Sequence, residues 1–103
     1  MLKRVKIEAA NPFKGSLELL RALSDETRQK IAMVFSDRKE ASAGDIAARF
    51  RLSRPTISHH LQVMRRAGLL KARKQGKEVY YSLDKGHVVG AMEALVKAIK
   101  TCR

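Results

Sequence analysis

Two short helices joined by a tight turn are the feature that most constrains the fold of this chain. Ser42 and Asp45 form a capping-box pattern, which predicts a short helix over about residues 43–50. Ser53 is positioned to cap a second helix over about residues 54–67. Two helices of this length, separated by so few residues, predict a helix-turn-helix.

The second of these helices has an apolar side and a polar side. Pro55 falls in its first turn, where the missing N–H costs nothing, and Gly68 lies just past its end, where glycine readily adopts a left-handed conformation. Helical spacing places Ile57, Leu61 and Met64 on one buried stripe. His59, Gln62 and Arg66 point outward on the opposite face. The N-terminal half offers groups that can hydrogen-bond to base edges or phosphates, namely Arg54, Thr56, Ser58, His59 and Gln62. An arbitrary polar helix face is usually only solvated, so the segment after the helix decides between the two interpretations.

A basic β-hairpin is predicted directly after this helix. Strand-like runs at about residues 69–73 and 78–83 flank a short connection in which Gly76 can supply a positive φ. Alone, such a hairpin is equally well explained as solvated surface. Beside a helix-turn-helix it is typical of a wing that contacts the DNA backbone or minor groove. The wing contacts that we expect come from Arg73, Lys74, Gln75 and Lys77, with Lys71 adding to the local charge.

The N-terminal part predicts an arm and two further helices. Residues 1–14 carry no clear period and are expected to form an arm in front of a domain spanning residues 15–103. Ser16 is expected to cap the first helix, and Ser24-Asp25 to begin the second. The apolar residues at helical spacing are Leu17, Leu20 and Leu23 in the first helix and Ile31, Val34 and Phe35 in the second.

Helical periodicity returns over about residues 86–101. Its apolar strip consists of Val88, Met92, Leu95 and Ile99, flanked by Val89 and Val96. In a chain of 103 residues, which buries only about two-thirds of its unfolded surface, such a strip favours a dimer interface, although it could also be intrachain core. The predicted fold class is mainly α with a small β-hairpin wing (α+β), a dimeric winged helix-turn-helix.

The composition points to a polyanionic partner. The chain has 22 Lys and Arg against 10 Asp and Glu, a net charge of +12, for which nucleic acid is the simplest explanation. No apolar run approaches the roughly 20 residues of a membrane span, and no apolar segment typical of a secretory signal comes after the basic start. We therefore expect a cytoplasmic protein without a membrane partner. The lone Cys102 excludes an internal disulfide and is either inert or a redox switch.

Four stretches resemble the ArsR/SmtB family of winged-helix repressors, from about Leu20 to the C-terminus. They are residues 22–28 (ALSDETR), 52–61 (LSRPTISHHL), 65–70 (RRAGLL) and 76–83 (GKEVYYSL). The resemblance implies a homodimer, built by the first and last helices, that binds an inverted repeat in double-stranded DNA and releases it when a ligand binds. The interface residues expected from it and from the apolar strip are Leu17, Leu20, Val88, Met92, Leu95 and Ile99.

The metal sites of the family lack their ligands in this sequence. The thiolate pair of the family corresponds here to Ser42 and Gly44. The site on the last helix keeps one ligand of four, whereas zinc needs about four. Its positions hold Lys85, His87, Ala98 and Thr101. We expect no metal and no cofactor, which leaves the inducer unidentified.

The function predicted from the sequence is that of a sequence-specific DNA-binding transcriptional regulator, a homodimeric repressor. The alternative is an architectural protein that coats DNA without choosing a site, since a charge of +12 would serve that purpose too. The polar, non-basic reading face argues against it, because architectural binders generally use wedge residues or basic arms. His60 is expected to be a packing or phosphate residue. The chain shows no catalytic constellation and is not expected to be an enzyme.

Overall fold

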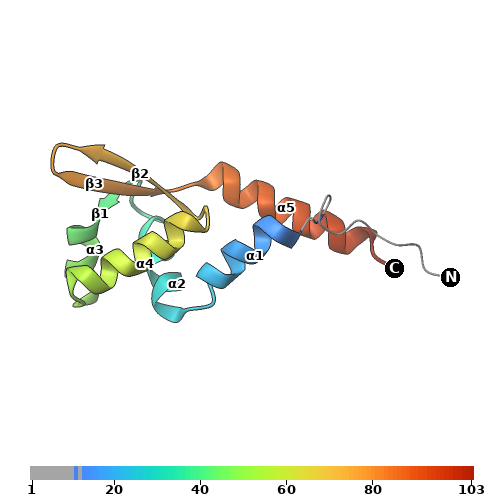
Figure 1. The fold of residues 1–103 in the computed structure, drawn as a ribbon, viewed down its shortest axis with the longest axis horizontal. Helices are drawn as coiled ribbons and strands as arrows, with labels where there is room; N and C mark the ends of the chain where they lie inside the picture. Colours follow the sequence, from blue (N-terminus) through green and yellow to red (C-terminus); the bar gives the residue numbers. More distant parts are fainter. Residues whose placement is uncertain (1–10, 12) are drawn as a thin grey trace.

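The computed structural model describes Asn11 and residues 13–103, which form five helices and one small sheet (Figure 1). The helices are α1 (Phe13–Ala22), α2 (Glu26–Val34), α3 (Ala43–Phe50), α4 (Arg54–Arg66) and α5 (Lys85–Thr101). The strands are β1 (Ala41–Ser42), β2 (Leu70–Gln75) and β3 (Glu78–Leu83). Figure 1 shows α2, α3 and α4 gathered on one side of the hairpin, while α5 extends away from it and α1 lies alongside α5. This is the winged helix-turn-helix fold expected from the sequence.

Side-chain caps set the starts of the central helices as predicted. The Ser42 hydroxyl accepts from the amide of Asp45, and the Asp45 carboxylate accepts from the amide of Ser42, each at 3.1 Å. This capping box also holds the pKa of Asp45 below its ordinary value, through its hydrogen bond with the Ser42 amide. At the start of α4, Ser53 accepts from the amide of Thr56 at 3.3 Å. The two helices of the helix-turn-helix therefore begin where the sequence places them.

The first helix begins earlier than expected. It starts at Phe13, whose amide donates to the Asn11 side chain at 3.0 Å. Ser16 is not its cap, because its hydroxyl donates to the carbonyl of Phe13 at 3.0 Å and the residue is only 1% exposed. Phe13 and Lys14 thus belong to α1, and the rest of the arm predicted over residues 1–14 lies, apart from Asn11, outside the described residues.

The sheet contains a strand that the sequence does not predict. β1 pairs antiparallel with β3, with Ala41 opposite Tyr81, so that the order is β1-β3-β2. The hairpin itself is longer than expected, since β2 and β3 pair up to Gln75 and Glu78 and leave a two-residue turn in which Gly76 has φ 62°. Strand β1 therefore joins β3 of the wing to the start of α3.

The core is built around the apolar stripe of α4. Ile57, Leu61 and Met64 are each 0% exposed, as are Leu19 of α1 and Ile46 of α3. Ile31, Val34 and Phe35 of α2 and Leu70 and Tyr81 of the sheet complete the cluster. Because α1, α2, α3 and β2 all pack against α4, the hydrophobic effect fixes the position of this stripe.

The end of α4 is a Schellman turn closed by glycine. The amide of Gly68 donates to Arg65 at 3.0 Å and that of Leu69 to Met64 at 2.9 Å, with Gly68 at φ 84°. A Cβ on Gly68 would overlap the imidazole of His87, the third residue of α5. Glycine is needed here for its backbone conformation, and a side chain in its place would also have to displace the exposed His87 imidazole.

Gly68→Ala is expected to lower the free energy of unfolding by about 1–2 kcal/mol from the left-handed backbone conformation, plus the smaller cost of displacing the exposed His87 imidazole. Urea denaturation measures it. Gly76→Ala is the matched control, because Gly76 also has positive φ but a Cβ there meets nothing within 4 Å. Gly68→Ala/His87→Ala should recover the excess over Gly76→Ala. Equal losses for the two single variants would contradict the close approach.

Candidate nucleic-acid interface

The polar face of α4 is open to solvent. Arg54, Thr56, His59 and Gln62 are exposed and Ser58 is half-buried. His59 and Gln62 lie opposite the buried stripe, and the other three flank it nearer the start of the helix. In the first turn the Thr56 hydroxyl lies 2.9 Å from the hydroxyl of Ser53, so the capping residue also orients Thr56. The exposed amides at the start of a helix attract phosphate, and the side chains behind them can meet base edges. The structure therefore presents on α4 the five side chains that the sequence singles out.

The start of α4 and the wing share one surface. A hollow of about 170 Å³ is lined by Arg54 and Ser58 of α4, Lys77 of the wing turn, and residues of α3 and β3. The Arg54 guanidinium lies beside Gly44, where a Cβ would come within 3.6 Å of it. The helix-turn-helix and the wing thus form a continuous face, which carries positive charge from both elements.

The side chain of Arg73 is hydrogen-bonded within the protein rather than free on the wing. Its guanidinium donates to both carboxylate oxygens of Glu40, at 2.9 and 3.0 Å, and to the side chain of Gln75. It also stacks over the ring of Tyr80, 5.1 Å from the ring centre. Arg73 therefore fastens β2 to the segment before β1. Contact of Arg73 and Gln75 with DNA stays a prediction, because both side chains already have partners within the chain.

The two lysines of the wing are differently placed. Lys74 and Lys77 are exposed, and among the described residues neither forms an ion pair. A lysine without a carboxylate partner keeps its full charge available to a phosphate. Lys74 and Lys77 are therefore the better-placed cations of the four wing residues named from the sequence.

A contact between Arg28 of α2 and His60 of α4 helps to position α4. The Arg28 guanidinium donates to the carbonyl of Ala22 at 2.6 Å and lies 3.3 Å from Nδ1 of His60. The amide of Arg28 donates to the Asp25 carboxylate at 3.0 Å, which lowers the pKa of Asp25 below its ordinary value. The half-buried His60 thus contacts Arg28 of α2. Sequence reasoning missed Arg28, because its partners lie six and 32 positions away.

The residues at the metal positions have other roles. Ser42 caps α3, Gly44 lies beside the Arg54 guanidinium, and His87 packs on Gly68. Across the part of the chain that the structure describes, no three His, Cys, Asp or Glu side chains gather in a way that would hold a metal ion. Over the same residues, no helix is long and apolar enough to cross a membrane. Cys102 is exposed near the end of the chain, and its thiol lies 3.2 Å from the carbonyl of Ala98.

The residues predicted for the dimer interface divide into two groups. Val88 and Met92 are half-buried and pack against the core of their own chain, and Leu95 is also half-buried. Ile99 is exposed, as are Leu17 and Leu20 of α1. Exposed apolar residues that adjoin them are Phe13, Val89 and Val96, the last two about half exposed. The exposed apolar surface of α5 is therefore centred on Val89 and Val96, the residues that flank the apolar strip predicted from the sequence.

These features define a winged helix-turn-helix protein, and comparisons with known proteins identify its family. Residues 25–72 match the family described as bacterial regulatory protein, arsR family. The chain is 46% identical over 76 residues to a cadmium resistance transcriptional regulatory protein CadC homolog of Staphylococcus aureus, covering 74% of this chain and 63% of that protein. It is 39% identical over 66 residues to the transcriptional repressor SdpR of Bacillus subtilis, covering 64% of this chain and 72% of that protein.

A solved structure resembles almost the whole chain. It is the solution structure of a homodimeric winged helix-turn-helix DNA-binding domain from Mycobacterium bovis, with a TM-score of 0.72 and 25% identity, covering 97% of this chain and 90% of that domain. The chain belongs to the ArsR family of regulatory proteins. It spans less than two-thirds of the length of the CadC homolog.

The ion pair between Arg73 and Glu40 has a measurable effect on the pKa of Glu40. The Arg73 guanidinium holds the pKa of Glu40 below its ordinary value of 4.5. Arg73→Gln should raise the pKa of Glu40 toward 4.5, as followed by NMR titration of the glutamate carboxyl carbons. Because the folded pKa is the lower one, the pair stabilises the fold above about pH 4.5 and loses this effect as the pH falls through the folded pKa. Lys74→Gln, the control, should leave the pKa of Glu40 in place, and an unmoved pKa in Arg73→Gln would refute the tie.

Proposed function

We propose that this protein is a homodimeric repressor that binds an inverted repeat in double-stranded DNA and occludes a promoter. The observation that carries the proposal is the shared surface on which Arg54 and Ser58 of α4 and Lys77 of the wing surround one hollow. A helix in the major groove and a wing on the adjacent backbone need this arrangement. The naming of SdpR as a transcriptional repressor supports the direction of regulation.

We assign the reading of sequence to α4 and the binding of phosphate to the wing. His59 and Gln62 stand on the exposed face of α4, where their side chains can donate to or accept from base edges. Thr56 and Arg54, nearer the start of the helix, are placed for phosphate as well as for bases. The lysines of the wing are point charges, which neutralise phosphate without reading sequence.

The second copy docks on the apolar faces of α1 and α5. Leu17 and Leu20 are 45% and 48% exposed, and Val96 and Ile99 are 50% and 57% exposed, which is an unusual amount of open aliphatic surface for so small a chain. A two-fold axis at this face would present both α4 helices to one side of a duplex. The homodimeric state of the Mycobacterium bovis domain supports this assembly.

The same proposal covers where and how the protein works. It acts in the cytoplasm, where promoter DNA lies, and without catalysis. Its inducer is something other than a metal held at the two metal sites of the family, since Ser42 and Gly44 at one of them offer no thiolate.

Because α4 is assigned to sequence reading and the wing to phosphate binding, single substitutions in the two elements should have different effects. Selection of bound sequences from random duplex DNA at 150 mM salt should enrich a short inverted repeat with half-sites about one helical turn apart. Ser58→Ala and His59→Ala should each lower the preference for that repeat over random DNA by about five- to 150-fold, corresponding to about 1–3 kcal/mol for a lost base contact. Lys77→Ala should weaken binding to both kinds of DNA about equally.

Salt dependence is the control for the electrostatic part. A dimer that neutralises roughly 6–10 phosphates should lose about 10³–10⁵ in affinity between 50 and 200 mM salt, and Lys77→Ala should flatten this slope. Enrichment of no motif would show an architectural protein, for which the net charge of +12 would suffice. A changed sequence preference in Lys77→Ala would overturn the assignment of reading to α4.

A single charged substitution tests the proposed dimer face. Val96→Glu places a carboxylate in the proposed interface and should convert the dimer to a monomer with the fold intact, because Val96 is half exposed in the single chain. Sedimentation velocity measures the mass and circular dichroism the fold. Ala94→Glu is the matched control, since Ala94 is exposed on the same helix about 160° around its axis from Val96. Dissociation of both variants, or of neither, would place the interface elsewhere.

A further inference from the structure

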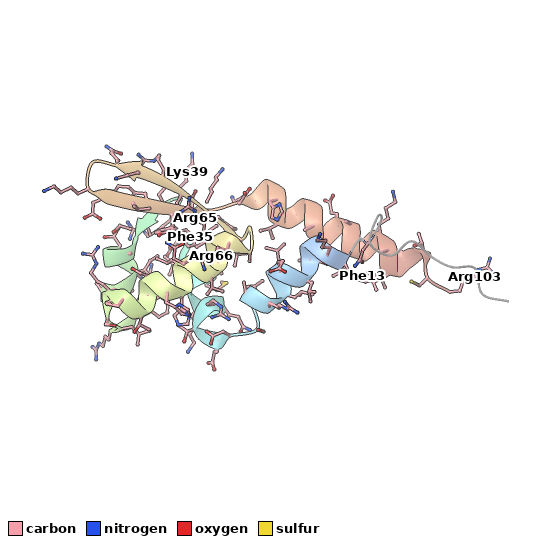
Figure 2. All side chains as sticks on the ribbon, in the orientation of Figure 1. Phe13, Phe35, Lys39, Arg65, Arg66 and Arg103 are labelled. Carbon is pink, nitrogen blue, oxygen red and sulfur yellow. The ribbon has the colours of Figure 1, made fainter. Side chains whose placement is uncertain are left out.

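A second concave surface lies at the base of the wing, away from the proposed DNA face. Its volume is about 540 Å³, and its walls come from the segment between α2 and β1, from the base of the hairpin, and from the first turn of α5. Lys71, at the hairpin base, pairs with Ser82 and lies about 17 Å along the strand from the wing turn. Figure 1 shows the first turn of α5 at the end of the hairpin opposite that turn, and Figure 2 shows Lys39 beside the strands.

The walls of this hollow are strongly basic. Four cations and one carboxylate line it, namely Arg38, Lys39, Lys71, Lys85 and Asp37. Four like charges from three separate segments around one hollow are held together by the fold against their mutual repulsion. An anion placed between them would relieve that repulsion.

The acidic groups near the hollow are already engaged. Asp37 lies 3.9 Å from Arg49, which stands outside the hollow, and Glu40 is held by Arg73 at 2.9 Å. Asp45 caps α3 and lies 3.6 Å from Arg38. Over the described residues, none of the three lysines of the hollow forms an ion pair. Among the residues that the structure describes, no ion pair compensates their charge.

The start of α5 adds backbone donors to these charges. The Asp84 side chain caps the amide of His87, which leaves the earlier amides of Lys85 and Gly86 without an acceptor inside the helix. Gly86 itself lines the hollow, and a Cβ built on it meets nothing within 4 Å. A ligand can therefore reach this backbone directly.

We propose that this hollow binds a small oxyanion of the phosphate type, held by Lys39, Lys71 and Lys85 and by the first amides of α5. Lysine serves as a point-charge phosphate binder, and backbone amides at a helix start complete such sites. The bound anion bridges the wing base to α5, the helix that carries the proposed dimer face. Its occupancy then restrains the position of the wing relative to that helix, which provides a route by which a small anionic metabolite adjusts the protein. This site goes beyond the proposed DNA-binding function and does not depend on it.

The test is an NMR titration of the ¹⁵N-labelled full chain with sodium phosphate, with sodium chloride adjusted to hold the ionic strength constant. Saturable shifts are expected at the amides of Lys71, Ser82, Lys85 and Gly86. Lys71→Gln should weaken phosphate binding about tenfold, the loss of one charge-assisted contact. Lys30→Gln is the matched control, since Lys30 is an exposed lysine of α2 outside the hollow, and it pairs with Glu26 at 3.3 Å. Shifts that do not saturate, or an equal loss in both variants, would overturn the site.

A second measurement separates a free anion from the phosphates of DNA. Fluorescence anisotropy with a random-sequence duplex should show that Lys71→Gln loses no more DNA affinity than Lys30→Gln, while Lys77→Gln loses clearly more. If Lys71→Gln instead matched Lys77→Gln, the partner of the hollow would be the DNA backbone, and the proposal of a small-anion site would be wrong. Because phosphate binding is measured without DNA, its failure would leave the proposed repressor function untouched.

Discussion

The burial of one stripe on α4 is the interaction on which the rest of the structure depends. Ile57, Leu61 and Met64 have no exposed surface, and the three other N-terminal helices and the sheet contribute to covering them. Burying three aliphatic side chains contributes about 1.5–3 kcal/mol each, a large share of the stability of a chain this small. Since one side of α4 is fixed in this way, the side that carries His59 and Gln62 must face solvent. The reading face is thus a consequence of the core.

Ion pairs within the chain decide which of its many cations are free. Arg73 is held by Glu40, Arg49 lies near Asp37 and Arg38 near Asp45, so these acids neutralise arginines in β2, in α3 and in the segment before β1. Such exposed pairs contribute little to stability. Their effect is on the distribution of charge, because they leave the lysines of the wing turn and of the hollow at its base as two separate basic sites. A high net charge alone would not have distinguished these two surfaces.

Sequence reasoning predicted the features that depend on near neighbours and missed those that depend on distant ones. The caps at Ser42 and Ser53 and the glycine that ends α4 involve residues within a few positions, so their patterns are visible in the sequence. The two residues of β1 are too short to show a period, and their partner strand begins more than 30 positions away. The tie of Arg73 depends on Glu40, 33 positions earlier, so the local pattern predicts only a wing cation. The start of α1 was misplaced because a serine inside a helix can resemble a cap.

The apolar pattern of α5 shows that helical periodicity alone does not say which side of a helix packs on its own chain and which side is open to a second copy. Val88 and Met92 pack on the core of their own chain, while Val89 and Val96, one step around the helix, are open. α5 is also joined to the end of α4, because the amide of Asp84 donates to the carbonyl of Leu69 at 3.0 Å and His87 packs on Gly68. A rotation of α5 driven from its open side must either break these contacts or move the end of α4 with it. The helix that offers a surface to a second copy is therefore coupled directly to the end of the helix that presents the reading face, through Leu69 and Gly68.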